Sequence, residues 1–220
     1  KLNFIGAVLH GLDANEYRFN SDVGQNHYVF IGRLVPDKGA HIAVKAASET
    51  GISLILATEL ERKDSVYYKE EIAPYINNSR IKLSGFLTKG KIDFYQRAKA
   101  LLFPIKWEEP FGLVMIEAMA CGTPVIAFDR GSVSEVIKDG VTGFIIQDSK
   151  SSGSNKCLIK RSGMEGIVEA VKRIESMSKI QYQSMRKACR EHVEKNFTRE
   201  VMAAGYEEIY KQVIRNAGIK

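Results

Sequence analysis

Short runs of apolar and β-branched residues alternate with longer segments of helical period from residue 28 to residue 146. The short runs have the length and composition of strands. The longer segments carry apolar residues three or four positions apart, which is typical of helices packed on one face. The pattern predicts strands at Tyr28–Gly32, Leu54–Ala57, Ile81–Ser84, Ala100–Phe103, Val125–Phe128 and Gly143–Ile146.

Between these runs the sequence predicts helices near 39–50, 66–76, 89–98 and 111–121 and a short one at 132–138. Residue types that favour helix ends support these positions: Thr88 and Ser132 as N-caps, and Gly51, Gly122 and Gly140 as helix stops. A polar, serine-rich loop follows at 147–155. Three further helices are expected at 164–177, 179–196 and 198–215, the last with Thr198 as its N-cap.

An alternation of strands and helices implies a parallel sheet with right-handed crossovers, so that helices cover both faces. We therefore expect an α/β fold, a doubly wound parallel sheet of about six strands with a helical C-terminal extension. The first 27 residues do not follow the alternation. They are expected to form a linker and an edge element.

The composition is that of a globular chain, with 220 residues, 45% hydrophobic and 26% charged, which excludes disordered and fibrous classes. Three widely spaced cysteines argue against a disulfide framework or a zinc site and favour a reducing cytoplasm. The apolar run 111–128 is interrupted by Glu117, two glycines and a proline, so it predicts a buried helix, turn and strand rather than a membrane span. Lys1 in place of Met suggests a fragment of a longer protein.

The net charge of +6 lies near the C-terminus: residues 1–154 hold 18 Lys or Arg and 18 Asp or Glu, whereas 155–220 hold 14 against 8. A solvated helical face and an anionic membrane surface both fit this excess. Glutamates interleaved with the cations favour the solvated face. Nucleic acid is disfavoured as a partner because no aromatic residues accompany the basic ones.

Candidate chemistry follows the predicted strands, because ligands of an open parallel sheet bind beyond the carboxyl ends of its strands. Arg33 and Lys38 lie on a glycine-flanked turn after the first strand, and 107–112 (WEEPFG) follows the fourth. Two cations and the free N–H groups at 111–113, where a helix begins, suit a diphosphate. A surface turn with solvated cations is the commoner explanation of the spacing of Arg33 and Lys38 alone.

Glu117 is the only charged residue in the apolar helix predicted at 111–121. An unpaired buried carboxylate is destabilising by several kcal/mol, so it must have partners. A core carboxylate satisfied by the backbone or by an arginine and a carboxylate that accepts from ligand hydroxyls explain it equally well. Glu109, at the mouth of the same helix, favours the second explanation, because two carboxylates beside a diphosphate pocket suit the hydroxyls of a nucleotide-sugar.

The run Glu109-Pro-Phe-Gly-Leu-Val-Met-Ile-Glu117 resembles the Glu, seven residues, Glu motif of the retaining GT-B glycosyltransferases, family four in the carbohydrate-enzyme classification. The segments 32–39 (GRLVPDKG), 85–87 (GFL), 131–144 and the closing 206–210 helix follow in the order that this family shows. The resemblance covers roughly residues 5–215. Several ordered motifs make it specific.

The resemblance implies that the chain is the Rossmann-like C-terminal half of a GT-B fold. It assigns 28–197 to the nucleotide-sugar-binding domain, 1–27 to the interdomain linker and 198–220 to a helix that crosses to a missing N-terminal half. Arg33 and Lys38 would neutralise the diphosphate, and Glu109 would contact the transferred sugar, so the resemblance implies that these three are the catalytic residues. The implied donor-binding residues are Gly32, Leu87 near the base, Phe111, Gly112 and Leu113 through their N–H groups, and Glu117 at the ribose.

The implied activity is transfer of a hexose from a UDP- or GDP-linked sugar to an acceptor hydroxyl, with retention of configuration and with neither metal nor cofactor. Because the acceptor side belongs to the missing half, this chain alone is expected to be inactive. A lipid-linked acceptor would add an anionic membrane surface as a partner of a cytoplasmic, peripheral protein. Two departures from the family pattern are Glu108, which could compete for the sugar, and Ile105-Lys106 in place of a small hydroxylated residue.

Two rival functions remain at this point. One is a non-catalytic nucleotide-sugar-binding or scaffolding module. The other is a nicotinamide dehydrogenase, which the absence of Gly-x-Gly-x-x-Gly after any predicted strand disfavours.

Overall fold

The computed structural model describes residues 4–21, 26–87, 90–148 and 157–216. Its centre is a six-stranded sheet in which all paired strands run parallel. The strands are β1 (His27–Ile31), β2 (Leu54–Ala57), β3 (Ile81–Ser84), β4 (Ala98–Phe103), β5 (Val125–Phe128) and β6 (Gly143–Ile146). All six predicted strands are confirmed, with β1 and β4 shifted slightly at their ends.

The strand order is β3-β2-β1-β4-β5-β6, the order of a Rossmann-like doubly wound sheet. The chain builds outward from β1 to β3 and then crosses back to place β4 on the other side of β1. The α-helices are α1 (Ala40–Thr50), α2 (Val66–Glu71), α3 (Lys91–Gln96), α4 (Leu113–Ala120), α5 (Val133–Val136), α6 (Gly163–Ser176), α7 (Lys179–Asn196) and α8 (Arg199–Asn216). Short 3₁₀ turns lie at Pro36–Lys38, Leu60–Asp64 and Ala73–Tyr75.

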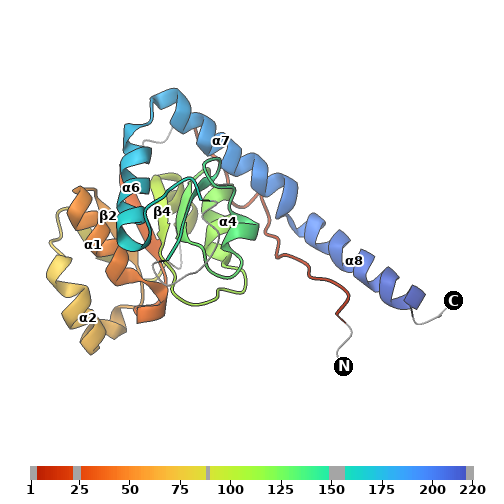
Figure 1. Ribbon diagram of the computed structural model, residues 1–220, viewed down its shortest axis with the longest axis horizontal. Helices are drawn as coiled ribbons and strands as arrows, with labels where there is room; N and C mark the ends of the chain where they lie inside the picture. Colours follow the sequence, from red (N-terminus) through yellow and green to blue (C-terminus); the bar gives the residue numbers. More distant parts are fainter. Residues whose placement is uncertain (1–3, 22–25, 88–89, 149–156, 217–220) are drawn as a thin grey trace.

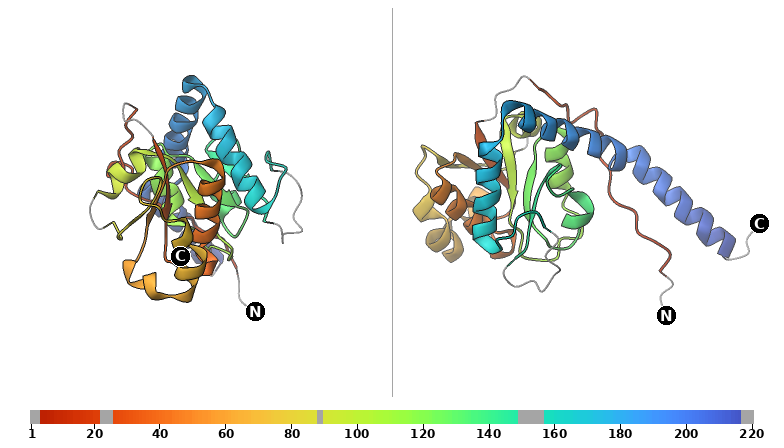
Figure 2. Two further views of the ribbon diagram at one scale, coloured as in Figure 1. Left: turned by 90° about the vertical axis from the view of Figure 1, so that its left-hand side faces the viewer. Right: turned by 45° about the horizontal axis from the view of Figure 1, so that its top comes forward.

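Alternate residues of each strand face opposite sides of the sheet and build two separate cores. In β1, Val29 and Ile31 enter one core with α4, whereas Tyr28 and Phe30 enter the other with α1 and α6. Helix α7 contributes to both cores as it crosses from one side to the other (Figures 1 and 2). The apolar helix predicted at 111–121 is α4. It is a core helix, because every residue from Met115 to Ala120 is buried.

Several predicted helices differ in length from the observed ones. The helix expected at 66–76 ends at Glu71, and Pro74, which has no N–H to continue the hydrogen-bond ladder, lies in the 3₁₀ turn that follows. The helix expected at 89–98 is only α3, because Ala98 already pairs with β1 as the start of β4. Thr88 lies outside the described residues, and Gly90 occupies the N-cap position of α3.

The predicted helix stops have mixed outcomes. Gly51 ends α1 in the left-handed conformation, with φ 72°, as predicted. Gly122 follows the end of α4 with φ 77°. Gly140 is not a helix stop, since α5 already ends at Val136. Thr198 accepts the N–H of Val201 at 3.2 Å through its hydroxyl, which confirms it as the N-cap of α8.

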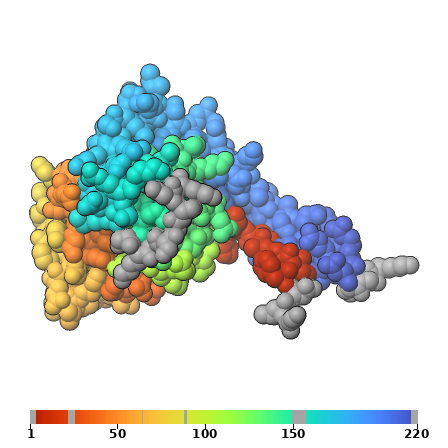
Figure 3. Space-filling view, in the orientation of Figure 1, coloured from red at the N-terminus to blue at the C-terminus, as the bar shows by residue number. Residues whose placement is uncertain are grey.

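The N-terminal segment and α8 leave the sheet together (Figures 1 and 3). Leu12 donates its N–H to Phe197 O at 2.9 Å and accepts from Arg199 N at 3.1 Å, so it forms one parallel bridge beside Thr198. Within 4–21 no strand joins the sheet, which differs from the edge element expected in 1–27. No residue of α8 is buried. The domain boundaries at 27 and 197 stay a prediction.

Candidate functional site

A pocket of about 620 Å³ lies beyond the carboxyl ends of β1 and β4. These two strands are neighbours at the point where the strand order reverses, which is where open α/β sheets bind their ligands. The structure brings all nine predicted site residues together on the wall of this pocket: Gly32, Arg33, Lys38, Leu87, Glu109, Phe111, Gly112, Leu113 and Glu117. Their roles stay predictions.

Lys38 and Glu109 form an ion pair within the pocket. Lys38 Nζ lies 2.8 Å from Glu109 Oε2, and Trp107 Nε1 donates to the same oxygen at 2.9 Å. The Lys38 ammonium also lies 4.7 Å from the centre of the Trp107 ring. Arg33 is exposed and has no ion-pair partner among the described side chains, so its guanidinium can receive an anion.

Backbone contacts fix the two loops that carry Lys38 and Glu109. Gly39 adopts φ 76°, and a Cβ there would lie only 2.0 Å from Pro104 O, so the loop after β1 touches the loop after β4 directly. Lys106 N donates to Asp37 O at 2.8 Å and closes the same contact. A side chain larger than hydrogen at position 39 would force the loops apart. The geometry of the ion pair thus depends on this glycine.

The N-terminus of α4 points its first N–H groups toward the pocket. Gly112 occupies the N-cap position with φ 76°, and helix N-termini favour negative charge. Directly before α5, Ser132 N donates to Glu109 O at 3.0 Å and Ser132 Oγ donates to Phe111 O at 2.8 Å. Ser132 lies at the predicted N-cap of α5, but its hydroxyl does not cap that helix. It holds the loop before α4 instead.

Glu117 is 8% exposed and is satisfied by protein side chains. Its Oε1 accepts from Lys91 Nζ at 2.6 Å and from Tyr17 OH at 3.0 Å, and its Oε2 accepts from Tyr95 OH at 2.9 Å. Burial, with the Glu117 charge nearby, raises the pKa of Tyr17 and Tyr95, so both hydroxyls stay protonated donors. Neither the backbone nor an arginine supplies these partners, in contrast to the expectation for a simple core carboxylate.

Glu108 does not line the pocket with Glu109. Its carboxylate accepts from Arg130 Nη1 at 2.9 Å and from Gly131 N at 2.6 Å. The hydrogen bond from Arg130, followed by that from Gly131, lowers the pKa of Glu108. Arg130 Nη2 donates to Asp148 Oδ2 at 2.8 Å. Glu108 is therefore engaged by Arg130 and Gly131 and does not lie on the pocket wall with Glu109.

Sequence reasoning assigned no site role to several pocket residues, among them His10, Glu59, Phe86 and Lys91. His10 reaches the pocket from the N-terminal segment and packs edge-on against Phe111, with ring centres 5.1 Å apart. Phe86 lies inside the 85–87 motif and was within reach of sequence analysis. Lys91 carries no pattern that would single it out.

A Rossmann-like sheet with a charged pocket at its switch point is the arrangement in which open α/β domains bind their ligands. The sequence profile of the family described as "Glycosyl transferases group 1" matches residues 13–195. The chain therefore belongs to the group 1 glycosyltransferases. This membership, with no glycine fingerprint after a strand, removes the dehydrogenase alternative.

A curated glycosyltransferase is similar to this chain in sequence, and a solved structure shares its fold. The D-inositol 3-phosphate glycosyltransferase of Rhodococcus erythropolis is 27% identical over 235 aligned positions, which span 96% of this chain and 49% of the relative. HepE of Anabaena, crystallised with UDP and glucose, superposes with a TM-score of 0.75 at 21% identity over 93% of this chain and 56% of HepE. The chain thus spans about half the length of these relatives.

A domain of this fold has been crystallised on its own. The C-terminal domain of LpcC, a group 1 family protein of Francisella tularensis, superposes with a TM-score of 0.66 at 18% identity, covering 86% of this chain and all of that domain. Within the described part of our chain, no helix is both long and apolar enough to cross a bilayer.

Proposed function

We propose that this chain is the donor-binding half of a glycosyltransferase that transfers a hexose from a nucleotide-diphosphate sugar to an acceptor hydroxyl. We further propose that the anomeric configuration is retained and that no metal or cofactor takes part. The observation that carries the proposal is the pocket between β1 and β4, where Arg33, Lys38, the N-terminus of α4, Glu109 and Glu117 converge. The presence of UDP and glucose in the HepE crystal supports a UDP-linked donor.

The cations and α4 act on the leaving group. As the bond from the sugar C1 to the phosphate oxygen breaks, negative charge grows on the diphosphate, so groups aimed there stabilise the transition state more than the ground state. Arg33 is free to bind a phosphate. Lys38 has three N–H donors and can keep its bond to Glu109 while it contacts the diphosphate. The N–H groups of Gly112 and Leu113 supply neutral donors at the same place.

The carboxylates bind hydroxyl groups. Glu109 uses one oxygen for Lys38 and Trp107, and its other oxygen accepts from the transferred sugar. In this role it orients the sugar and need not be a nucleophile.

The nucleoside of the donor is bound by other residues. Glu117 accepts from the ribose hydroxyls, and the main chain of Leu87 contacts the base. The acceptor comes from the N-terminal half of the whole enzyme, so we propose that this chain alone does not turn over.

A contact with an anionic membrane is a further part of the proposal, suited to a lipid-linked acceptor. Several cations of α7 and α8 are paired within their own helix: Lys187 with Glu191 at 3.5 Å, Arg190 with Glu194 at 2.6 Å and Lys211 with Glu208 at 3.0 Å. These pairs neutralise part of the positive charge. We expect co-sedimentation with anionic vesicles at low salt only, and no binding at low salt would contradict this part.

Calorimetric titration of the chain with UDP-, GDP- and ADP-sugars tests the donor proposal. We expect one nucleotide to bind, and we expect Arg33→Ala and Glu109→Gln each to raise its Kd by about tenfold or more, which corresponds to the loss of one charge-assisted contact. Arg97→Ala is the matched control, because Arg97 is exposed and follows α3 at the opposite end of the sheet. Added EDTA is expected to leave the Kd unchanged.

Two results of the titration would contradict the donor proposal. If the folded chain binds none of the three nucleotide sugars, the donor-site proposal fails and the scaffolding alternative gains. If Arg97→Ala weakens binding as much as Arg33→Ala does, net charge rather than the pocket is responsible.

A further inference from the structure

The carboxylate of Glu117 has little freedom left. It accepts three hydrogen bonds from Lys91, Tyr17 and Tyr95, and a carboxylate offers about four acceptor positions. Since Glu117 lines the pocket, the position that remains is the one a ligand hydroxyl can use. The three protein donors therefore decide the direction in which Glu117 accepts from a ligand.

One of these donors comes from outside the sheet domain. Lys91 and Tyr95 both lie on α3, next to α4 in the same core. Tyr17 belongs to the N-terminal segment, 100 residues away from Glu117 along the chain. Its ring packs partly buried against the core that contains α4. The segment before β1 thus supplies one hydroxyl to the Glu117 carboxylate, in addition to the His10 ring on the pocket wall.

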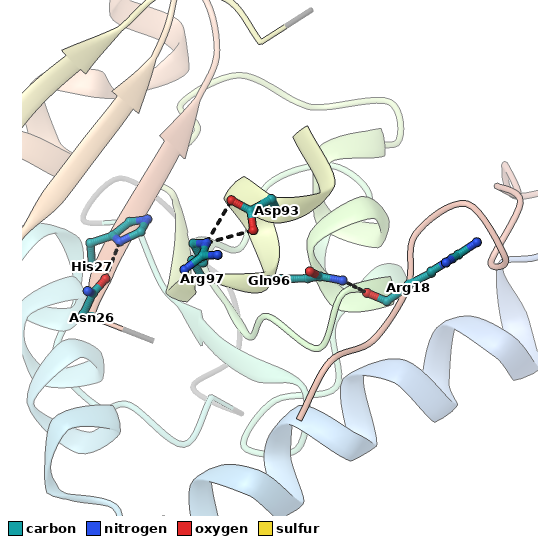
Figure 4. A network of polar contacts seen from close by, with 6 residues as sticks. All are labelled: Arg18, Asn26, His27, Asp93, Gln96 and Arg97. Carbon is teal, nitrogen blue, oxygen red and sulfur yellow. Dashed lines mark hydrogen bonds and ion pairs between the residues drawn. The ribbon is translucent and has the colours of Figure 1, made fainter. Parts of the chain in front are cut away.

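The backbone around Tyr17 is fastened to the domain from two sides. Arg190 Nη1 donates both to Tyr17 O and to Ala120 O, at the end of α4, the latter at 3.0 Å. On the other side, the side-chain amide of Gln96 from α3 donates to Arg18 O (Figure 4). Tyr17 is consequently held between α7, α3 and the helix that carries Glu117.

A second arginine extends this attachment. Arg186 is fully buried, and it donates to Gly122 O at 3.1 Å and to Asn20 O at 2.9 Å. Its guanidinium also lies 5.1 Å from the centre of the Phe19 ring. A buried guanidinium is destabilising unless its donors are used, so carbonyl partners from this segment are part of the stable fold. Upstream, the same segment bridges α8 through Leu12.

We infer that Tyr17 is a positioning residue for Glu117, so that the segment 4–21 helps to set the affinity of the pocket for the ribose of the donor. This inference rests on the proposed function. Without the Tyr17 hydroxyl, Oε1 of Glu117 is held by Lys91 alone, and the carboxylate can turn toward that ammonium and away from the ribose. Tyr17 itself touches no part of the donor.

The test compares two ligands on two variants. Calorimetry measures the Kd of UDP and of 2′,3′-dideoxy-UDP, or of the corresponding purine pair if a purine nucleotide binds, for the native chain, Tyr17→Phe and Tyr28→Phe. Tyr28 is the matched control because its hydroxyl donates to Glu175 at 2.8 Å, outside the pocket. We expect Tyr17→Phe to raise the Kd for the ribose nucleotide about three- to tenfold, the range of one hydrogen bond, and to leave that for the dideoxy analogue unchanged.

Other calorimetric results would refute either the positioning role of Tyr17 or the ribose role of Glu117. If Tyr17→Phe keeps the native preference for ribose, or weakens both nucleotides equally, the positioning role is refuted while the donor site stands. The same holds if Tyr28→Phe reduces the ribose preference as strongly. If the native chain binds neither nucleotide or does not distinguish them, the ribose role of Glu117 in the proposed function fails, and the inference falls with it.

Discussion

Replacing Gly39 by alanine tests whether the contact between the two pocket loops holds the site together. Gly39 and Gly51 adopt nearly the same left-handed backbone, with φ 76° and 72°, and each caps a helical turn. They differ in what a Cβ would meet. At position 51 the nearest atom is the flexible Arg80 Nη1 at 3.5 Å, whereas at position 39 it is the backbone oxygen of Pro104 at 2.0 Å. Gly51→Ala is thus a control matched in chemistry and conformation.

The expected magnitudes differ accordingly. An L residue in the left-handed region is destabilising by about 1–2 kcal/mol, and the reduced freedom of the unfolded chain offsets about 0.4–1 kcal/mol of this. For Gly51→Ala the free energy of unfolding should therefore fall by roughly 0.5–1 kcal/mol. Gly39→Ala adds an overlap with a backbone atom, which overpacking data place at about 1–3 kcal/mol, occasionally more. We expect a total loss of about 1.5–4 kcal/mol.

Urea titration of both variants measures these losses, and donor calorimetry follows their effect on the site. Because Gly39 holds the Lys38 loop against the Glu109 loop, Gly39→Ala is expected to weaken donor binding, whereas Gly51→Ala leaves it unchanged. Equal stability of the two variants would refute the close approach of Gly39 to Pro104. A Gly39→Ala variant that is destabilised but binds donor normally would show that the ion pair does not depend on this contact.

Three further predictions concern single side chains. Glu108→Gln is expected to leave the donor Kd within about twofold of native, unlike Glu109→Gln, because Glu108 is engaged by Arg130 outside the pocket; equal weakening in calorimetry would contradict this. Trp107 is the only tryptophan of the chain and contacts Glu109, so its emission should change during a donor titration with the calorimetric midpoint; constant emission at saturation would argue against a donor at this pair. Burial lowers the pKa of His192 below its ordinary 6.5, so the unfolded chain binds more protons as the pH falls through 6.5 and stability declines there. His192→Gln should flatten this decline in urea titrations between about pH 7.5 and 5.5, and an unchanged slope would refute it.

The sheet was predictable because its strands are short apolar runs that the sequence separates clearly. The residues at which the helices begin and end were harder to predict, because they depend on tertiary pairing. Ala98, for example, belongs to β4 because it pairs with His27 of β1, and no local pattern near residue 98 indicates this. Ser132 has the residue type of a cap, yet its hydroxyl binds Phe111 O from another loop. Long-range partners of this kind are invisible to periodicity.

The members of the site were also predictable, but their contacts were not. Position beyond a strand end identified Lys38 and Glu109, and Glu117 was identified as the only charged residue of an apolar helix. That Lys38 pairs with Glu109 depends on the approach of two loops, and that Tyr17 reaches Glu117 depends on a segment folded back over α4. Both contacts join residues more than seventy positions apart, so the sequence carried no local sign of either.

The N-terminal segment and α8 run side by side away from the sheet (Figure 2), and this pairing restricts how either stretch can bend. A Cβ at Gly205 would lie 3.0 Å from Val8 and one at Gly6 3.3 Å from Ile209, so the two stretches pack closely. Each stretch therefore braces the other. Because Leu12 is also bridged to Thr198, α8 cannot bend away from the sheet at its first turn without displacing the N-terminal segment with it.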